Sequence, residues 1–483
     1  MKILFASSEA APFAKTGGLA DVSGTLPKFI REMGHDVRLI IPLHQCIDEG
    51  KFNLRRVAGF FVPVGERQVE AEIFEGRLGD LPVYFIKKDR YFDRPELYGT
   101  SHGDYPDNAE RFVFFSRGVI EAANVLGFHP DVIHCNDWQA ALVPAYLKTL
   151  YNADPFFGKT ASVLTVHNLA YQGVFWHLDL PMTGLSWDLF TPEFLEFYGK
   201  INFLKAGLVF ADILTTVSKT YSKEVQTPEH GWGLDGVLRI RKKELFGIVN
   251  GIDAQEWDPG TDREIASSFS ARSLKGKDKN RKALREEMGL ADTSAPLLAF
   301  VGRLAGQKGV DLLAEVIERL GDTDCQFVVL GSGEEHLQRL LVDVANRHPG
   351  RVAVHVGFDA GLARRVYAGA DMFLMPSRYE PCGIGQLISL RYGTIPVVHR
   401  TGGLADTVSE FSATSGKGNG FTFRELTVES FAKAIQKAVK TYQNRPAWTR
   451  LVKNAMACDF SWDSSAEQYL KLYEKAVRMR TAK

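Results

Sequence analysis

Two copies of one six-residue segment could bind an anion. Thr-Gly-Gly-Leu-Ala-Asp occurs at residues 16–21 and 401–406, directly after a cation, Lys15 in the first copy and Arg400 in the second. A strand-like run precedes each copy and a helix-like run follows, so both glycine pairs are expected at strand-to-helix turns. Glycine lets a phosphate approach the backbone, and the N–H groups that begin a helix supply positive potential. An isolated Gly-Gly pair is more often a plain tight turn, but its recurrence behind a cation favours an anion site.

Polar residues also follow strand-like runs in the first half of the chain. Asp137 comes after the run at residues 132–134, and His167 and Asn168 come after the run at 162–166. Side chains directly behind buried strands are frequent in active sites, although helix capping and turns account for many of them. We therefore expect Asp137 and His167 to belong to the site.

The second half of the chain offers two cations and a carboxylate. Arg303 and Lys308 lie five residues apart among glycines, after the run at 297–301, and could clamp a diphosphate. A basic surface turn is the alternative. Glu380 lies in Ser-Arg-Tyr-Glu-Pro-Cys-Gly, between the run at 372–375 and a helix-like segment. A carboxylate at such a place can bind sugar hydroxyls or a developing positive charge.

The elements that must position these groups form an α/β pattern. Short apolar runs typical of buried parallel strands alternate with helix-length segments. The pattern restarts after residue 296, so we predict two doubly wound, Rossmann-like domains that face a central cleft. Between residues 57 and 86 strands follow one another without room for helices, which indicates an antiparallel insertion or edge. The runs are residues 3–6, 37–41, 83–86, 132–134, 162–166 and 213–217, then 297–301, 327–330, 352–356, 372–375 and 395–398.

Length and composition set limits on the class of protein. A chain of 483 residues exceeds what one hydrophobic core usually organises. Lys plus Arg and Asp plus Glu both number 58, so the charge does not favour nucleic acid or an anionic membrane as a partner. Five scattered cysteines form no CxxC pair, so the sequence predicts neither a zinc site nor a disulfide framework. A reducing cytoplasm is the location that fits this pattern best. No run reaches the roughly eighteen apolar residues of a membrane span, and the first residues lack a signal-peptide pattern. The sequence sets no oligomeric state.

Four weaker signals concern local structure. Residues 275–282 are basic, but a solvated loop and helix start is favoured over nucleic-acid contact. Asp322-Thr-Asp324 spells the DxD motif of metal-dependent glycosyltransferases, yet its position between a helix and a strand favours a surface turn. Gly331-Ser-Gly333 begins like a dinucleotide fingerprint but has His336 where the third glycine belongs. The amphipathic segment 461–477 could close the second domain or cross back to the first.

A set of motifs, in order along nearly the whole chain, resembles those of bacterial glycogen synthases and plant starch synthases (glycosyltransferase family 5). The motifs are Lys-Thr-Gly-Gly-Leu (15–19), Asn-Asp-Trp (136–138), Thr-Val-His-Asn-Leu (165–169), Lys-Ala-Gly (205–207), Gln-Thr-Pro-Glu (226–229), Gly-Leu-Asp-Gly-Val (233–237), Val-Asn-Gly-Ile-Asp (249–253), Gly-Arg-Leu with Gln-Lys-Gly (302–309) and Ser-Arg-Tyr-Glu-Pro-Cys-Gly (377–383).

The resemblance implies a GT-B architecture, with domains at residues 1–250 and 251–458 and a C-terminal helix at 459–483 that crosses back to the first domain. The activity it implies is transfer of glucose from ADP-glucose to the non-reducing 4-hydroxyl end of an α-1,4-glucan, with retention of configuration. Such enzymes are thought to use front-face attack, in which the departing phosphate takes the acceptor's proton. The resemblance therefore implies no protein nucleophile, no metal and no cofactor. The partners it implies are a nucleotide-sugar donor and an α-glucan, glycogen or maltooligosaccharide, in the cytoplasm.

The resemblance also implies roles for single residues. In the catalytic set, Glu380 would hold the glucose hydroxyls, Asp137 would lie near the reacting centre, His167 near the 6-hydroxyl, and Arg303 with Lys308 at the leaving diphosphate. The other implied donor contacts are Lys15, Gly17, Gly18, Asn250, Phe358, Cys382, Gly383, Thr401, Gly402 and Gly403. The segment implied on the acceptor side carries Tyr105, Asp107, Asn108 and Arg111.

One departure from the family pattern concerns the base of the donor. Phe358 falls where many relatives have a tyrosine that stacks on adenine, so stacking would survive but a hydroxyl is lost. A UDP-glucose-dependent glucosyltransferase and a nucleotide-sugar epimerase are therefore the alternatives. A non-catalytic glucan-binding protein is a further alternative, and the intact catalytic set counts against it.

Overall fold

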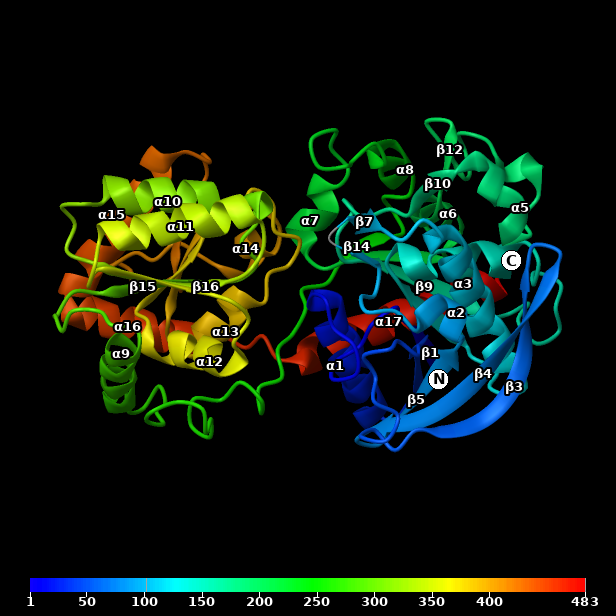
Figure 1. Ribbon diagram of the computed structural model, residues 1–483, viewed down its shortest axis with the longest axis horizontal. Coiled ribbons are helices and arrows are strands. Elements are labelled where there is room, and N and C mark those ends of the chain that lie inside the picture. The colour runs from blue at the N-terminus through cyan, green and yellow to red at the C-terminus, as the bar shows by residue number, and fades with distance from the viewer. Residues whose placement is uncertain (101, 483) are drawn as a thin grey trace. The chain divides into compact units, whose positions relative to one another are not determined.

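The computed structural model describes residues 1–100 and 102–482, which divide into two compact units (Figure 1). Unit 1 contains Met1–Ile248 together with the C-terminal segment Trp462–Lys483, and unit 2 contains Val249–Ser461. The chain thus passes between units at 248/249 and at 461/462, close to the boundaries expected at 250/251 and 458/459. Residue 483, the last of the expected C-terminal helix, lies outside the described residues.

Unit 1 is built on a nine-stranded sheet in the order β14-β13-β9-β8-β1-β2-β5-β4-β3. All neighbouring strands pair in parallel except that β4 pairs antiparallel with both β3 and β5, so the antiparallel insertion expected there is confirmed. The strands are β1 Lys2–Ala6, β2 Asp36–Pro42, β3 Arg55–Val64, β4 Arg67–Leu78, β5 Leu81–Lys87, β8 Val132–Asn136, β9 Ala161–Val166, β13 Ile213–Thr216 and β14 Leu245–Gly247.

Helices cover both faces of this sheet (Figure 1). Helix α1 (Gly18–Glu32) and the C-terminal helix α17 (Trp462–Thr481) pack on the face that carries Phe5. The ring of His134 on β8 bonds through Nδ1 to the Tyr473 hydroxyl of α17 at 2.7 Å, which anchors the last helix to the sheet. Helices α3 (Asn108–Val125) and α6 (Phe203–Phe210) approach the opposite face so closely that glycines, Gly118 and Gly207, stand at the contacts with Ile86 and Leu164.

Unit 2 is built on a six-stranded parallel sheet in the order β17-β16-β15-β18-β19-β20. Numbered from its first strand this is 3-2-1-4-5-6, the order of a dinucleotide-binding Rossmann fold. Its strands read as unbroken apolar runs because both faces are buried. They are β15 Leu297–Val301, β16 Gln326–Gly331, β17 Val352–Val356, β18 Met372–Met375, β19 Ile395–His399 and β20 Phe421–Phe423.

The two faces of the unit 2 sheet are buried by different helices (Figure 1). Phe300 and its alternate neighbours pack under α10 (Val310–Arg319), α11 (Glu335–Arg347) and α15 (Val428–Gln443). Ala299 and its alternate neighbours pack under α9 (Lys275–Glu287), α12 (Ala360–Gly369) and α13 (Gly385–Arg391). This alternation confirms doubly wound packing in the second half of the chain.

The remaining elements are short except for one helix, α16 (Arg445–Met456), which follows α15. The others are α2 Asp89–Phe92, β6 Gly99–Thr100, β7 Gly103–Asp104, η1 Trp138–Ala140, α4 Leu142–Lys148, β10 Val174–Trp176, η2 His177–Asp179, α5 Leu180–Thr183, η3 Trp187–Leu189, β11 Glu196–Phe197, β12 Lys200–Asn202, α7 Lys219–Glu224, α8 Asp235–Ile240, η4 Gly306–Lys308 and α14 Gly402–Thr407. Over the residues that the structure describes, no helix combines the length and the apolar character needed to cross a membrane.

The basic run at residues 275–282 is not the wholly solvated segment that the sequence predicted. It forms the first half of α9, and Lys277 is buried with only 6% of its surface exposed. Its ammonium donates to the carbonyl oxygens of Ala368 and Tyr392 and to Thr394 Oγ1, while burial lowers its pKa to about 7. The expectation of a solvated segment is wrong at Lys277, because this lysine ties α9 to the core of unit 2.

Candidate active site

In unit 1 the expected residues follow three neighbouring strands. Strand β1 lies between β2 and β8, and β9 follows β8 in the sheet. The strand order reverses at β1, which is the switch point where open α/β sheets bind ligands beyond the carboxyl ends of their strands. Ala6 pairs with Cys135, and Asn136 with Thr165, so the three strands end at the same level.

The first glycine turn, between β1 and α1, presents open backbone. Gly17 precedes α1 in an extended conformation, and a Cβ atom built there would meet nothing within 4 Å. Gly18 is the first residue of α1, so its N–H points out of the helix without an intrahelical acceptor. The Lys15 ammonium lies half exposed beside them and pairs with Asp21 at 2.6 Å. These groups together can receive an anion.

A buried carboxylate, which the sequence did not reveal, holds this turn. Glu9 is 2% exposed, and its Oε2 accepts hydrogen bonds from the N–H and the hydroxyl of Thr16, each at 2.7 Å. Burial raises the pKa of Glu9 to about 7. Its only sequence signal is a charged residue within an apolar, small-residue segment directly after a buried strand.

Asp137 and His167 meet at the ends of β8 and β9. The His167 N–H donates to Asp137 Oδ1 at 2.7 Å, and the Asp137 N–H donates to the Thr165 carbonyl at 2.9 Å. Asp137 has a φ of 53°, a left-handed conformation that is uncommon for residues other than glycine and is typical of functional sites. Burial, followed by the nearby Glu9 carboxylate, raises the pKa of Asp137 to about 7. The structure therefore brings together the two residues that the sequence predicted.

The imidazole of His167 is neutral and its tautomer is set by a neighbour. Burial lowers the pKa of His167 to about 3. The Asn136 amide N–H₂ donates to the Ala6 carbonyl at 3.1 Å, so its Oδ1 faces His167 Nε2 at 3.0 Å and accepts a hydrogen bond from it. Nε2 then carries the hydrogen, and Nδ1 is left as a hydrogen-bond acceptor.

Asp137→Asn should stabilise the protein at neutral pH. The pKa of about 7 in the folded protein lies above the ordinary aspartate pKa of 3.8, so folding favours the protonated acid and stability falls as pH rises between these values. An amide cannot ionise, so Asp137→Asn removes this dependence on pH. We expect a gain of about 1–3 kcal/mol at pH 7.5 that largely disappears at pH 4.5.

Urea denaturation at the two pH values measures this gain. Asp322→Asn, in an exposed turn, is the control and should show no pH-dependent gain. A variant Asp137→Asn that is less stable than the wild type at pH 7.5 would contradict the assignment of a strained, buried carboxyl group.

In unit 2 the expected residues follow β15, β18 and β19. These strands are neighbours, and the order of the sheet reverses between β15 and β18. The Lys308 ammonium pairs with Glu380 Oε2 at 2.6 Å, and the Ser377 hydroxyl donates to the same oxygen at 3.0 Å. Glu380 is 5% exposed, whereas Arg303 is exposed and its guanidinium contacts only Gln307 among the described side chains, at 3.3 Å. A cation–carboxylate pair and a second, exposed cation thus follow the strands at the switch point.

The backbone places Lys308 beside Glu380. Gly309 has a φ of 67°, and a Cβ there would lie 2.1 Å from the Pro376 carbonyl oxygen, so only glycine allows the two turns to touch. The Arg378 N–H donates to the Gln307 carbonyl at 2.8 Å, which closes the contact between the turns.

The second glycine turn differs from the first. The Gly403 N–H donates to the carbonyls of Glu380 and Pro381 at 3.0 and 3.1 Å. A Cβ at Gly402 would lie 2.0 Å from the Glu380 carbonyl oxygen, and one at Gly403 would lie 2.0 Å from that of Cys382. The Gly403 amide is thus already engaged, and this glycine pair supports the Glu380 loop.

Gly403→Ala should damage both stability and transfer, because its Cβ must displace the backbone that carries Glu380. A misplacement of this kind can lower kcat about a hundredfold. Gly17→Ala is the matched variant in the other copy, and its unfolding midpoint should equal that of the wild type because space is open there. Thermal unfolding of both variants and the kcat of Gly403→Ala test this. Equal unfolding midpoints for the two variants would contradict it.

The other residues expected at the donor lie near Glu380 or at the same edge of the sheet. The Oδ1 atom of Asn250 is buried and has no hydrogen-bond partner in the described chain, so it is available to a hydroxyl group. The thiol of Cys382 is buried, which raises its pKa to about 12 and makes it a poor nucleophile. Gly383 adopts a φ of 74° above the Gln386 side chain, and Thr401 is buried. Phe358 follows β17 and is 87% exposed, an open ring for stacking.

The segment expected on the acceptor side is partly internal. Arg111 is fully buried and donates to the carbonyls of Tyr91 and Leu97 and to Asn108 Oδ1. Asn108 is also buried, and Asp107 pairs with Arg94 at 2.5 Å. Tyr105 lies against the guanidinium of Arg111. Arg111 and Asn108 therefore hold the loop at the start of α3 through these bonds.

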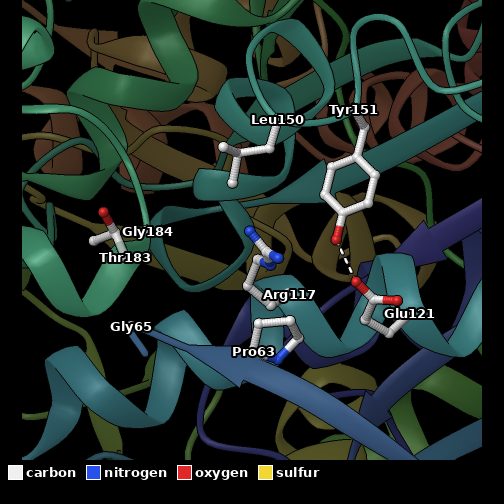
Figure 2. Close-up of a pocket in the computed structure, with 8 residues that line it drawn as sticks. All are labelled: Pro63, Gly65, Arg117, Glu121, Leu150, Tyr151, Thr183 and Gly184. Atoms are coloured by element: carbon white, nitrogen blue, oxygen red, sulfur yellow. Dashed lines mark hydrogen bonds between the residues drawn. The ribbon is translucent and has the colours of Figure 1, made fainter. Parts of the chain in front are cut away.

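A cavity of about 450 Å³ lies elsewhere in unit 1 (Figure 2). In Figure 2 the Tyr151 hydroxyl points at Glu121, to which it donates a hydrogen bond. None of the expected site residues borders this cavity, so it carries no part of the site. Its lining residues are Pro63, Gly65, Arg117, Glu121, Leu150, Tyr151, Thr183 and Gly184. Across the described ranges no cluster of His, Cys, Asp and Glu has the arrangement of a metal site.

Comparisons with known proteins agree over the whole chain. The family model "Starch synthase catalytic domain" matches residues 2–240, and "Glycosyl transferases group 1" matches residues 281–455. A glycogen synthase of Syntrophotalea carbinolica is 48% identical over 484 residues, with all of both chains covered. One of Thermosipho africanus is 44% identical, with 99% of this chain and all of that chain covered.

The fold also matches that of solved structures. The catalytic domain of starch synthase IV from Arabidopsis thaliana, bound to ADP and acarbose, superposes with a TM-score of 0.91 at 35% identity and 99% coverage of both chains. Sucrose-phosphate synthase from Thermosynechococcus elongatus shares the fold at 16% identity, with a TM-score of 0.61 and 98% of both chains covered. The chain therefore belongs to the glycogen synthase and starch synthase family of GT-B glycosyltransferases.

Proposed function

We propose that this protein transfers glucose from ADP-glucose to the non-reducing 4-hydroxyl end of an α-1,4-glucan, with retention of configuration. The observation that carries the proposal is the Lys308–Glu380 pair beside Arg303 at the switch point of unit 2. Such a site offers two cations for a diphosphate and a buried carboxylate for sugar hydroxyls. Membership of the family supports the same chemistry.

The proposed division of labour follows from charge. When the bond between the anomeric carbon and the diphosphate breaks, negative charge grows on the leaving oxygens. Arg303, Lys308 and Lys15 would stabilise that charge, which is commonly the largest catalytic contribution. Of these three cations, Lys15 belongs to unit 1, and Arg303 and Lys308 belong to unit 2.

The sugar is held by neutral and acidic groups. Glu380 would accept hydrogen bonds from glucose hydroxyls, and the unpaired Asn250 Oδ1 would accept another. Neutral His167 would use Nδ1 as an acceptor near the 6-hydroxyl, as its low pKa allows at physiological pH. Asp137 would lie near the reacting centre and the acceptor.

Retention is proposed to proceed without a protein nucleophile. The high pKa of the buried Cys382 thiol argues against covalent catalysis by that residue. The acceptor hydroxyl would attack from the side of the leaving group, and the departing phosphate would take its proton. With cations already at the diphosphate, we propose that no metal takes part.

ADP-glucose is proposed over UDP-glucose because of the exposed Phe358 ring and the family. A phenyl ring stacks on adenine over a larger area than on uracil, since a purine has two fused rings. The five cysteines are all free thiols, which agrees with the proposed cytoplasmic location.

Initial rates with ADP-glucose, UDP-glucose and GDP-glucose, on glycogen and on short maltooligosaccharides, test the proposal. We expect ADP release that depends on glucan and is fastest with ADP-glucose. A faster rate with UDP-glucose would overturn the donor assignment. Turnover of the nucleotide sugar without glucan would favour the epimerase, and absence of turnover would favour a binding protein.

A further inference from the structure

Glu9 is a buried carboxylate that the proposed mechanism does not yet use. It lies in the segment between β1 and α1, is 2% exposed and forms no ion pair within the described chain. The nearby ammonium of Lys15 pairs with Asp21 instead. Burying a carboxylate without a cation lowers the free energy of unfolding, and an apolar residue at such a core position would make the protein more stable. This cost needs a compensating role.

The bonds of Glu9 reach one residue, Thr16. Both the N–H and the hydroxyl of Thr16 donate to Glu9 Oε2 at 2.7 Å. Thr16 lies between Lys15 and Gly17, the groups proposed to receive the diphosphate. A Cβ atom built at Gly17 would meet nothing within 4 Å, so no neighbour packs on that side of the turn, and the pair of bonds to Glu9 helps to hold the turn in place.

The base of Glu9 is rigid, which makes it a suitable anchor. The Ser7 hydroxyl donates to the Glu9 carbonyl at 2.8 Å, and Ser23 of α1 donates to the Ser7 hydroxyl at 2.9 Å. The neighbouring Ser8 bonds through its hydroxyl to Tyr98 at 2.7 Å and through its carbonyl to His44 at 2.8 Å. This buried polar network holds residues 7–9, and Glu9 transmits their position to Thr16.

The chain between Glu9 and Thr16 is a closed loop of its own. The Ala14 N–H donates to the Ala10 carbonyl at 3.0 Å, and the Ala11 N–H donates to Ala20 in α1 at 2.9 Å. Glu9 and Thr16 therefore meet at the neck of this loop. Removing the Glu9–Thr16 contact would release Thr16, while the other hydrogen bonds of the loop and of α1 would remain.

We propose that Glu9 is a positioning residue of the transferase: by holding Thr16 it places the Lys15 ammonium and the amides of Gly17 and Gly18 for the diphosphate of the donor. The role rests on the proposed function, and Glu9 itself touches neither donor nor acceptor. This role distinguishes the two glycine turns. The buried carboxylate of Glu9 holds the first turn in place, whereas the second turn packs directly on the Glu380 loop.

Kinetics of Glu9→Ala, Glu9→Gln and Thr16→Val test the proposal. Loss of two hydrogen bonds to a charged group should raise the KM for ADP-glucose by about tenfold or more in Glu9→Ala. The KM for glycogen should change by less than about twofold. Glutamine keeps an oxygen for both donors, so Glu9→Gln should return the KM for ADP-glucose to within about threefold of the wild type. Thr16→Val loses the hydroxyl bond alone and should lie between wild type and Glu9→Ala.

Asp212→Asn is the matched control. Asp212 is a buried carboxylate of unit 1 that accepts from the N–H and hydroxyl of Ser162 at 2.8 and 3.0 Å, at the opposite end of the strands. This variant should lower the thermal midpoint without a selective rise in the KM for ADP-glucose. If Glu9→Ala and Thr16→Val behave like it, or keep the wild-type KM, the positioning role is overturned.

Binding of ADP separates this inference from the proposed function. A wild-type protein that transfers no glucose refutes the function. Calorimetric titration with ADP then still decides the role of Glu9, because weaker ADP binding by Glu9→Ala than by the wild type supports it and equal affinity overturns it. Should Glu9→Ala fail to fold, Thr16→Val supplies the same decision.

Discussion

Glu380→Ala is expected to lower kcat for glucosyl transfer by about a thousandfold. The substitution removes the acceptor for sugar hydroxyls and leaves the Lys308 ammonium, now paired with it at 2.6 Å, without its carboxylate. The freed lysine would then hold the leaving diphosphate in a different place, so ground-state binding should survive better than catalysis. Initial rates at saturating ADP-glucose and glycogen measure the loss, with KM determined alongside.

Two further variants show whether this loss comes from the charge of Glu380 and whether it is specific to the site. Glu380→Gln keeps an oxygen for Ser377 and for the sugar but not the charge, and should lose about ten- to a hundredfold in kcat. Glu318→Ala removes a carboxylate from the surface of the same unit, where it pairs with Arg347 and His348, and should stay within about twofold of the wild type. Unchanged transfer by Glu380→Ala would refute the site assignment in unit 2.

Lys15→Ala is expected to cost far more transfer than Arg400→Ala, although both cations precede the same six residues. We expect a loss of about a hundredfold in kcat for Lys15→Ala and less than about threefold for Arg400→Ala. Lys15 stands before a turn with open backbone at Gly17. Arg400 stands before a turn whose Gly403 amide is bonded to the Glu380 loop. Parallel rate measurements on the two variants give the comparison.

The charge at Lys15 should be what matters. Lys15→Arg keeps a cation and should recover part of the rate that Lys15→Ala loses. Equal losses in Lys15→Ala and Arg400→Ala would overturn the ranking and would mean that both glycine turns contact the donor.

Much of the site could be placed from local sequence because of the way parallel strands are buried. A strand covered on both faces reads as an apolar run, so the run before Asp137 or Glu380 marked the end of a strand without knowledge of its neighbours. The carboxyl ends of such strands lie at one edge of the sheet. The structure confirmed these strands and brought Asp137 to His167 and Lys308 to Glu380.

The sequence missed residues whose burial and hydrogen-bond partners come from other segments of the chain. Glu9 belongs to no chemical motif, and its role depends on a neck contact with Thr16 seven residues away. The basic run at 275–282 looked solvated, yet three oxygen acceptors from distant segments bury Lys277. Nothing in the sequence indicated that Arg111 is fully buried, with its guanidinium bonded to backbone carbonyls. Acceptors contributed by other segments are invisible in a local pattern.

By itself the sequence determined the α/β class, the ends of most strands, the family and the set of residues that carry charge to the site. Only the tertiary structure decided the order of the strands, and with it that β15, β18 and β19 deliver Arg303, Glu380 and Gly403 side by side. It also showed that the two identical glycine turns differ in their contacts, with open space at Gly17 and close packing at Gly403. Apolar periodicity is local and can be read along the chain, whereas the partner of an N–H or a carboxylate is fixed by packing between segments far apart in sequence.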